Sequence, residues 1–277
     1  MIMDIHSKKK LSNGVEIPVT GLGVYLSPAG EVTADSVRWA VEAGYRHIDA
    51  AAVYGNEESV GEGIRTCGVP REQLFITSKL WNDDMRKGRQ REAFQETLKK
   101  LGTDYLDLYL IHWPVENHAE SWHVLEDLYR SGLVRAIGVS NYHRQHLDEL
   151  AAEAEIVPMV NQFECHPYLS QEPLMELCRE RGMVCEAYSP LGGQNGPVLS
   201  DPGILKLAQD HGRTAAQIVL RWHLQKGRVV LPKSNHRERI CSNLEIFDFE
   251  LSAAEMETMD HLNQDLRTGG NPDCFDF

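Results

Sequence analysis

The chain has 277 residues, a formal net charge of −13 at pH 7, and apolar and charged fractions of 42% and 25%. These values are ordinary for a globular protein, and the negative charge argues against binding to nucleic acid or to an acidic membrane surface. No stretch has the roughly 18 apolar residues of a membrane span, the polar N-terminus lacks a signal-peptide core, and six scattered cysteines without a metal-binding spacing favour reduced thiols in a cytoplasmic protein.

The first predicted element is a β-hairpin over residues 10–17, because the turn pair Asn13-Gly14 lies between two short β-like runs. A buried strand over residues 19–24 follows, and from there strands and amphipathic helices alternate. The other predicted strands cover residues 46–50, 74–79, 106–112, 134–140, 158–162, 184–189 and 229–233. The predicted helices cover residues 33–43, 57–67, 89–101, 121–131, 143–153, 171–181, a segment after Pro202, 215–225, 236–243 and 253–262, before a polar tail.

This alternation amounts to about eight β-then-α units without a linker or a change in composition. Apolar strands between amphipathic helices predict a parallel sheet covered by helices. Eight units favour a closed barrel over an open doubly wound sheet, and no G-x-G-x-x-G follows the first strand. The sequence therefore predicts an α/β fold, a (β/α)8 TIM barrel with an N-terminal β-hairpin and additional C-terminal helices, in one domain over residues 1–277.

Four chemically active side chains lie at or just past the ends of three successive predicted strands, namely Asp49, Tyr54, Lys79 and His112. In an α/β barrel such ends meet at one face, where active sites are built. Taken singly, each has a structural explanation: a buried ion pair for the aspartate, or core packing for the tyrosine and the histidine. Their common placement favours a shared site.

These four side chains suit the reduction of a carbonyl group. A free tyrosine, with a pKa of about 10, is a weak acid at neutral pH, and we expect the Lys79 ammonium to lower the pKa of Tyr54. Asp49 would keep Lys79 charged and oriented, and His112 would donate a hydrogen bond to the substrate oxygen. Since none of these groups supplies a hydride, a nicotinamide cofactor is required.

Several motifs of the chain resemble the aldo-keto reductases. They are residues 49–57, Lys79-Leu80-Trp81-Asn82, Ile111-His112-Trp113-Pro114, residues 138–142, residues 161–167, Ser189-Pro190-Leu191-Gly192 and Pro232-Lys233-Ser234. The resemblance runs from about Leu11 to the C-terminus and is strongest to short members such as 2,5-diketogluconate reductases and prostaglandin F synthase-like enzymes. It implies a (β/α)8 barrel, NADPH, a monomer, and a catalytic tetrad of Asp49, Tyr54, Lys79 and His112 in which Tyr54 is the general acid.

The same resemblance implies a cofactor site. Ser140, Asn141 and Gln162 would hydrogen-bond the nicotinamide carboxamide, and Tyr188 would stack on the nicotinamide ring. The other cofactor-binding residues that it implies are Gly23, Val24, Ser189, Leu191, Lys233, Ser234, Asn235, Arg239 and Asn243.

A local excess of positive charge supports this site from the residues alone. Lys233, Arg237 and Arg239 begin a predicted helix in an otherwise acidic chain, and a helix N-terminus with guanidinium groups suits a phosphate. The sequence thus favours NADPH over NADH, although Arg237 also fits a solvated helix face. The glycine-rich segment over residues 192–196 is either a flap that closes over the pyrophosphate or an ordinary loop.

Aromatic residues after strand ends predict the substrate site. Tyr25, Trp81 and Trp113, together with His112, would wall a cleft that accepts apolar and planar carbonyl compounds; the alternative for each ring is packing at the barrel rim. A short loop over residues 115–120 and a short tail predict an open cleft and broad reduction of aldehydes and ketones, including methylglyoxal-like dicarbonyls. Arg267 would reach an anionic substrate.

Two other functions fit parts of this pattern. A class I aldolase would use Lys79 as a Schiff-base nucleophile. A non-enzymatic NADPH-sensing subunit would keep the fold and the cofactor but lack turnover, and the complete tetrad argues against it. The expected partner is a small-molecule carbonyl substrate, without a metal, nucleic acid or membrane.

Overall fold

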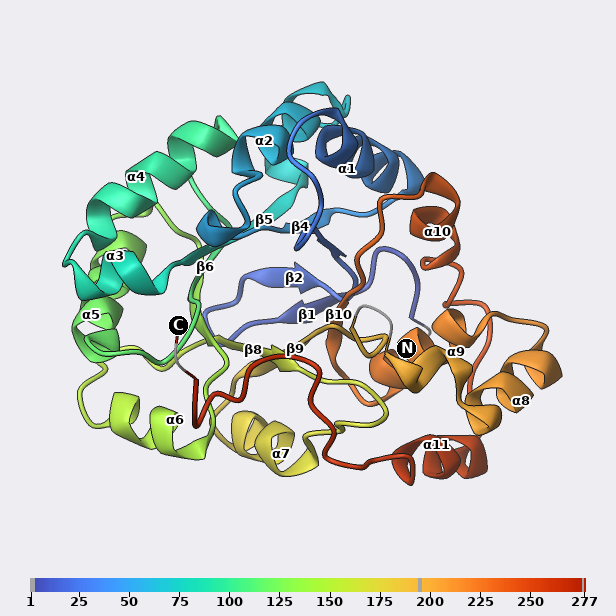
Figure 1. The fold of residues 1–277 in the computed structure, drawn as a ribbon. Helices are drawn as coiled ribbons and strands as arrows, with labels where there is room; N and C mark the ends of the chain where they lie inside the picture. The colour runs from blue at the N-terminus through green and yellow to red at the C-terminus, as the bar shows by residue number, and fades with distance from the viewer. Residues whose placement is uncertain (1–2, 194–195, 276) are drawn as a thin grey trace.

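The computed structural model of the chain describes residues 3–193, 196–275 and 277, and within them eight parallel strands form a barrel surrounded by helices (Figure 1). The strands are β3 (Leu22–Gly23), β4 (His47–Asp49), β5 (Phe75–Leu80), β6 (Leu108–Ile111), β7 (Ile137–Ser140), β8 (Val160–Glu164), β9 (Val184–Tyr188) and β10 (Val229–Leu231). Each strand pairs with the next one along the chain. The predicted TIM barrel is confirmed.

The barrel closes between its first and last strands. The amide of Gly21 donates to the carbonyl of Val230 over 2.9 Å, and the amide of Gly23 donates to that of Pro232 over 3.0 Å. A Cβ on residue 21 would lie 2.8 Å from the ring of His47, closer than packed atoms approach. Glycine is therefore needed here. Strand β3 has two residues where the sequence predicted a strand of six.

Helices cover the outside of the barrel in the predicted alternation. They are α1 (Glu31–Ala43), α2 (Glu57–Thr66), α3 (Asn82–Arg86), α4 (Gln90–Leu101), α5 (His118–Arg130), α6 (Arg144–Ala151), α7 (Glu172–Glu180), α8 (Pro202–His211), α9 (Ala215–Gln225), α10 (Arg237–Ser242) and α11 (Ala253–Asp260). Helix α3 was not predicted, and α5 begins at His118, inside the segment predicted as a loop. Side-chain caps fix several N-termini: Thr214 and Gln217 form a capping box at α9, as Ser252 and Glu255 do at α11.

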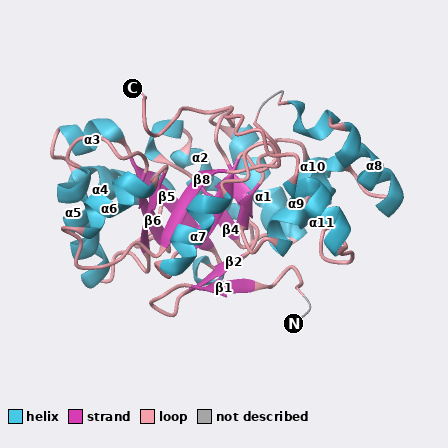
Figure 2. Ribbon diagram, turned by 90° about the horizontal axis from the view of Figure 1, so that it is seen from below, coloured by secondary structure: helices cyan, strands magenta, loops and turns pink. Residues whose placement is uncertain are grey.

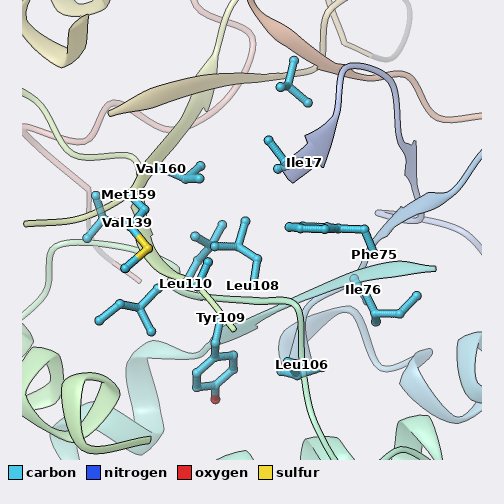
Figure 3. Close-up of a cluster of buried hydrophobic side chains, with 14 of the residues drawn as sticks. Ile17, Phe75, Ile76, Leu106, Leu108, Tyr109, Leu110, Val139, Met159 and Val160 are labelled. Carbon is cyan, nitrogen blue, oxygen red and sulfur yellow. The ribbon is translucent and has the colours of Figure 1, made fainter. Parts of the chain in front are cut away.

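The predicted hairpin is present as β1 (Lys8–Lys10) and β2 (Glu16–Pro18), which pair antiparallel. It lies at the end of the barrel opposite the C-terminus (Figure 2). Its fully buried Ile17 side chain lies in one cluster with Phe75, Leu108 and Val160 (Figure 3). This apolar contact seals the amino end of the barrel and contributes about 1.5–3 kcal/mol for the isoleucine alone.

The barrel also buries polar side chains, all less than 5% exposed: His47, Asp49, Thr77, Lys79, Gln162 and Glu186. Burial of such groups is unfavourable unless they hydrogen-bond one another. They therefore mark the part of the interior that serves a purpose other than packing.

Three further features bear on the predictions from composition. Within the described ranges, no helix combines the length and apolar character needed to cross a membrane. The same residues contain no group of three histidine, cysteine or acidic side chains that would hold a metal ion. All six cysteines belong to the described part and are free thiols.

Candidate active site

The carboxyl ends of β4 and β5 bring Asp49 and Lys79 into direct contact. The Lys79 ammonium donates to Asp49 Oδ1 over 2.6 Å and to the Ala50 carbonyl over 2.9 Å. The two charged side chains are 0% and 5% exposed. In a buried pair of this kind each charge compensates the other, and separating the two side chains would leave each charge uncompensated in a poorly solvated place. The ion pair therefore keeps both side chains in position.

Tyr54 joins this pair from the loop after β4. A 3-10 turn over Ala52–Tyr54, ended by Gly55 in the left-handed conformation (φ 68°), returns the side chain over the strand end. The Lys79 ammonium lies 3.3 Å from the Tyr54 hydroxyl. A carboxylate, an ammonium and a phenol thus form one hydrogen-bonded line, with the half-buried tyrosine at its outer end.

His112 lies one residue past β6, and its ring centre is 5.8 Å from that of Tyr54. Its backbone carbonyl accepts from Asn141 Nδ2 over 3.0 Å, which fixes the residue. Among the described residues, His112 Nδ1 has no hydrogen-bond partner. Burial, with a smaller contribution from Lys79, lowers the pKa of His112 well below its usual value, so the imidazole is neutral.

The electrostatics of the tyrosine differ from the sequence-based expectation. Burial raises the pKa of Tyr54 to about 12, and the Lys79 ammonium only partly offsets this. For Lys79, burial acts to lower the pKa, but Asp49 and the Tyr54 hydroxyl outweigh it and raise the pKa above 10.5. Lys79 does act to lower the Tyr54 pKa, as predicted, but the expectation that the pKa comes closer to neutral was wrong, because the sequence does not reveal how strongly the site is desolvated.

The residues predicted for the nicotinamide lie at the ends of β7, β8 and β9. Gln162 Nε2 donates to Asp49 Oδ2 over 2.9 Å and to Glu186 Oε2 over 3.1 Å, so both amide hydrogens are used and the carbonyl oxygen is left for a donor. A carboxamide NH2 is such a donor. The Tyr188 hydroxyl donates to Asn141 Oδ1 over 2.7 Å, which fixes the half-buried ring proposed to stack on the nicotinamide.

Asn141 is more constrained than predicted. Its Nδ2 atom donates both to the His112 carbonyl and to Ser140 Oγ, which lies 3.1 Å away. The Asn141 backbone has a left-handed φ of 66°. A contact to the carboxamide is therefore restricted to the remaining acceptor capacity of Oδ1, while the internal bonds make Asn141 a link between β7, β9 and the His112 loop.

The residues predicted for the phosphate end follow β10. Lys233 and Arg239 are exposed, and neither has an ion-pair partner within the part of the chain that the structure describes. Arg237 instead pairs with Glu42 of α1 over 3.0 Å. The two unpaired cations fit a 2′-phosphate, whereas Arg237 matches the alternative of a solvated helix face.

The remaining predicted cofactor residues line the same end of the barrel. Val24 donates to the Asp49 carbonyl over 3.2 Å, and Asn235 accepts from Ser27 over 2.8 Å. A Cβ on residue 23 would lie 3.3 Å from the Leu231 carbonyl, so Gly23 permits the close approach of β3 to β10. Ser189, Leu191, Ser234 and Asn243 follow β9 or β10. Of the predicted flap over residues 192–196, residues 194 and 195 lie outside the described residues.

The aromatic residues predicted for the substrate surround Tyr54 and His112. The Tyr25 ring centre is 5.0 Å from that of Tyr54, and the Trp81 ring centre is 5.2 Å from that of His112. Trp113, 8% exposed, lies farther along the same rim.

The tail after Leu266 is short, as predicted, but the prediction that it leaves the cleft open was wrong. The segment after α11 runs across the carboxyl face of the barrel (Figure 1). Two of its rings pack on the aromatic wall. Phe275 and Phe277 each lie 4.9 Å from Trp113 between ring centres, and Phe277 also stacks on Trp81 at 6.1 Å. Arg267 donates to His143 Nε2 over 2.9 Å, and its contact with an anionic substrate stays a prediction. Two phenylalanines in a polar tail were the available signal.

The sequence reasoning also missed Glu164, which holds the tail in place. Its fully buried carboxylate accepts from Thr268 N, Thr268 Oγ1 and Gly269 N over 2.7, 2.6 and 3.0 Å. Burial acts against the charge, but these bonds and one from His166 lower the pKa of Glu164 to about 2. The tail is therefore anchored by an anion at the end of β8.

We expect Glu164→Gln to release this anchor. The glutamine amide cannot accept all three bonds, so the free energy of local opening of the tail should fall by ~2 kcal/mol. This fall corresponds to roughly 30-fold faster amide exchange at Thr268 and Gly269. Since the pKa of Glu164 is lowered in the folded protein, the carboxylate stabilises the tail fully above pH 4.5, and this stabilisation is lost as the pH falls toward about 2. Hydrogen exchange measured by mass spectrometry checks this, with Thr268→Val, which removes one bond, as the milder control. Unchanged exchange in Glu164→Gln would contradict the anchor.

Comparison with known proteins identifies the family. A sequence model described as the Aldo/keto reductase family matches residues 25–264. Glyoxal reductase of Bacillus subtilis is 50% identical, with 95% of each chain covered. The 9,11-endoperoxide prostaglandin H2 reductase of Trypanosoma cruzi is 46% identical, covering 96% of this chain and 94% of that one. The crystal structure of a Bombyx mori aldo-keto reductase in complex with NADP is 38% identical, covers 96% of both chains and has a TM-score of 0.89.

The barrel and these relatives define an oxidoreductase of the (β/α)8 class that works with a nicotinamide cofactor. The chain belongs to the aldo/keto reductase family, and its cofactor is NADP(H). The resemblance stated from the sequence motifs is thereby confirmed.

Proposed function

We propose that the protein reduces aldehydes and ketones, including dicarbonyls, to alcohols with NADPH, and that Tyr54 is the general acid. The observation that carries this proposal is the line from Asp49 through Lys79 to the Tyr54 hydroxyl, with contacts of 2.6 and 3.3 Å, beside the neutral ring of His112. Bound NADPH supplies the hydride. The chain supplies the proton and the place where the carbonyl oxygen is held.

Each residue has one task in this scheme. The high pKa keeps the Tyr54 proton in place at neutral pH until charge develops on the substrate oxygen, and the Lys79 ammonium then stabilises the phenolate left behind. We assign the tautomer with the proton on Nε2 to His112. The buried Nδ1 has no hydrogen-bond partner among the described residues, and leaving an acceptor lone pair unpaired costs less free energy than leaving an N–H donor unpaired. Its Nε2–H donates to the same substrate oxygen and orients it.

The tail favours small or flat substrates. Trp81, Trp113 and the two phenylalanines of the tail offer apolar faces with few hydrogen-bonding groups, so they select by shape more than by polar recognition. One relative is named for glyoxal and another for a prostaglandin endoperoxide, which supports a broad range.

The aldolase alternative is disfavoured by the state of Lys79. Its ammonium is fully buried, has three oxygen partners and has a raised pKa. A Schiff-base lysine needs a free amine, which these contacts oppose. We also propose a cytoplasmic monomer; the six free thiols support the reducing compartment.

Cofactor choice is tested at Arg239. We expect Arg239→Ala to raise the KM for NADPH by about 10- to 100-fold, because a charge-assisted bond to phosphate is lost, and to change the KM for NADH little. Arg237→Ala is the matched control, since this arginine is occupied by Glu42. Steady-state kinetics with both cofactors give the values. Equal effects of Arg239→Ala on the two cofactors would remove this residue from the phosphate site.

A further inference from the structure

The hydrogen-bonded line of the tetrad continues into the barrel. Behind Lys79, the second oxygen of Asp49 accepts from Gln162 Nε2 over 2.9 Å. The same nitrogen donates to Glu186 Oε2 over 3.1 Å. β8 and β9 are in register here, with Gln162 beside Glu186, so the contact follows from the sheet itself. Two acidic side chains thus share one amide, and both lie in the interior.

Glu186 has an unusual environment for a carboxylate. It is 0% exposed, and its Oε1 atom has no hydrogen-bond partner among the described residues. His47 Nε2 is 3.9 Å away and bonds Thr77 Oγ1 instead, over 3.0 Å. Burial, followed by Lys79, lowers the pKa of His47 to about 3, so this ring brings no positive charge. No cation is in contact to compensate an ionised Glu186 within the described part of the chain.

The titratable groups that face Glu186 come from β4 and β5, which pair with each other in the barrel. Strand β4 contributes His47 and Asp49, and β5 contributes Lys79. Strand β8 presents the non-titrating Gln162, and β10 is entirely apolar. Burial and the Asp49 charge raise the pKa of Glu186 to about 8, against smaller opposing effects of Gln162 and Lys79.

We propose that Glu186 is a positioning residue for carbonyl reduction. As a neutral carboxyl, it shares the Gln162 amide with Asp49 and leaves Asp49 as the single anion opposite Lys79. It also holds the Gln162 carbonyl oxygen toward the nicotinamide. The kinetic part of this inference rests on the proposed function. Ionisation of Glu186 in mild alkali adds a second negative charge behind Lys79. That charge favours retention of the protons on Lys79 and Tyr54, so it sustains the acid form of the tyrosine at higher pH.

The first experiment needs neither cofactor nor turnover. Infrared difference spectra of the protein should show the C=O stretch of a neutral carboxyl at pH 7 that disappears with a midpoint near pH 8. Because burial also raises the pKa of Glu57, the band is assigned by subtracting the spectrum of Glu186→Gln. Glu164→Gln is the matched control on the adjacent strand, since the pKa of Glu164 is lowered and it contributes no such band. Absence of a band that titrates near pH 8, or a wild-type spectrum that Glu186→Gln leaves unchanged, would overturn the proposal.

The second experiment follows the pH profile of reduction. Glu186→Gln keeps an oxygen that accepts from Gln162 but cannot ionise, so the alkaline limb of kcat should move to lower pH by about one unit. A purely structural glutamate would change the amplitude and leave the limb in place, and that result would also overturn the proposal. If the wild-type protein reduces no carbonyl compound, the proposed function fails, while the infrared test still decides the state of Glu186.

Discussion

Tyr54→Phe should lower kcat for aldehyde reduction by about 10²- to 10⁴-fold, the usual contribution of a positioned general acid. The ring keeps its packing against Tyr25, but the hydroxyl that lies 3.3 Å from the Lys79 ammonium is lost. We expect the affinity for NADPH to remain, because no predicted cofactor contact involves this oxygen. NADPH oxidation with 4-nitrobenzaldehyde measures the first quantity, and fluorescence titration measures the second.

The control for this prediction is Tyr105→Phe, which removes a phenol remote from the site, beside Arg71. It should retain wild-type turnover. If Tyr54→Phe were as active as this control, Tyr54 would not be the acid. If no variant and no wild-type preparation turned over while NADPH bound tightly, the alternative of a cofactor-sensing protein would gain support.

The second large effect concerns the Asp49–Lys79 pair. Asp49→Asn leaves an ammonium in the barrel without its 2.6 Å counter-ion, and we expect a loss of about 3–5 kcal/mol in the free energy of unfolding. The double variant Asp49→Asn/Lys79→Met removes both charges and should regain most of that loss. Both variants should be catalytically impaired by at least 10²-fold, because Asp49→Asn removes the carboxylate that holds Lys79 in place and the double variant also removes the charge that stabilises the phenolate. Urea denaturation and the aldehyde assay separate the two quantities.

The pH dependence gives the sign of this interaction. The pKa of Lys79 is higher in the folded protein than its ordinary 10.5, so its stabilisation is fully present below that value and is lost as the pH rises through the folded pKa. The stability gap between wild type and the double variant should therefore shrink in strong alkali. A gap that stays constant as the pH is raised from 10.5 through the folded pKa of Lys79 would show that Lys79 is not held by charge.

The convergence of the tetrad could be predicted because the ends of strands can be recognised in a sequence. An apolar run that stops at a charged or polar residue marks both the end of the strand and the face on which that residue lies. Lys79 is inside β5 and Asp49 ends β4, close to where the pattern placed them. Their catalytic roles remain predictions, whereas the family and the barrel are confirmed.

The supporting groups could not be predicted in the same way. Glu164 and Glu186 lie within strands, and nothing in the local pattern tells a buried carboxyl from an ordinary polar residue on a strand. Their partners come from distant segments, so only the folded geometry reveals them. The tail is a similar case, because Phe275 meets Trp113 across more than half the length of the chain. The pKa of Tyr54 was misjudged since desolvation depends on all these contacts at once.

The hydrogen bonds from the tail to Glu164 have a practical consequence. Two of its three bonds are to main-chain amides, which every non-proline residue offers, so the anchor depends little on which side chains follow Gly269. We therefore expect that the last eight positions can be exchanged as a cassette that keeps the Glu164 anchor and changes the contacts with Trp81 and Trp113. Libraries confined to residues 270–277 would thus alter substrate preference while the reaction chemistry stays constant, which makes this short segment the natural starting point for redesign.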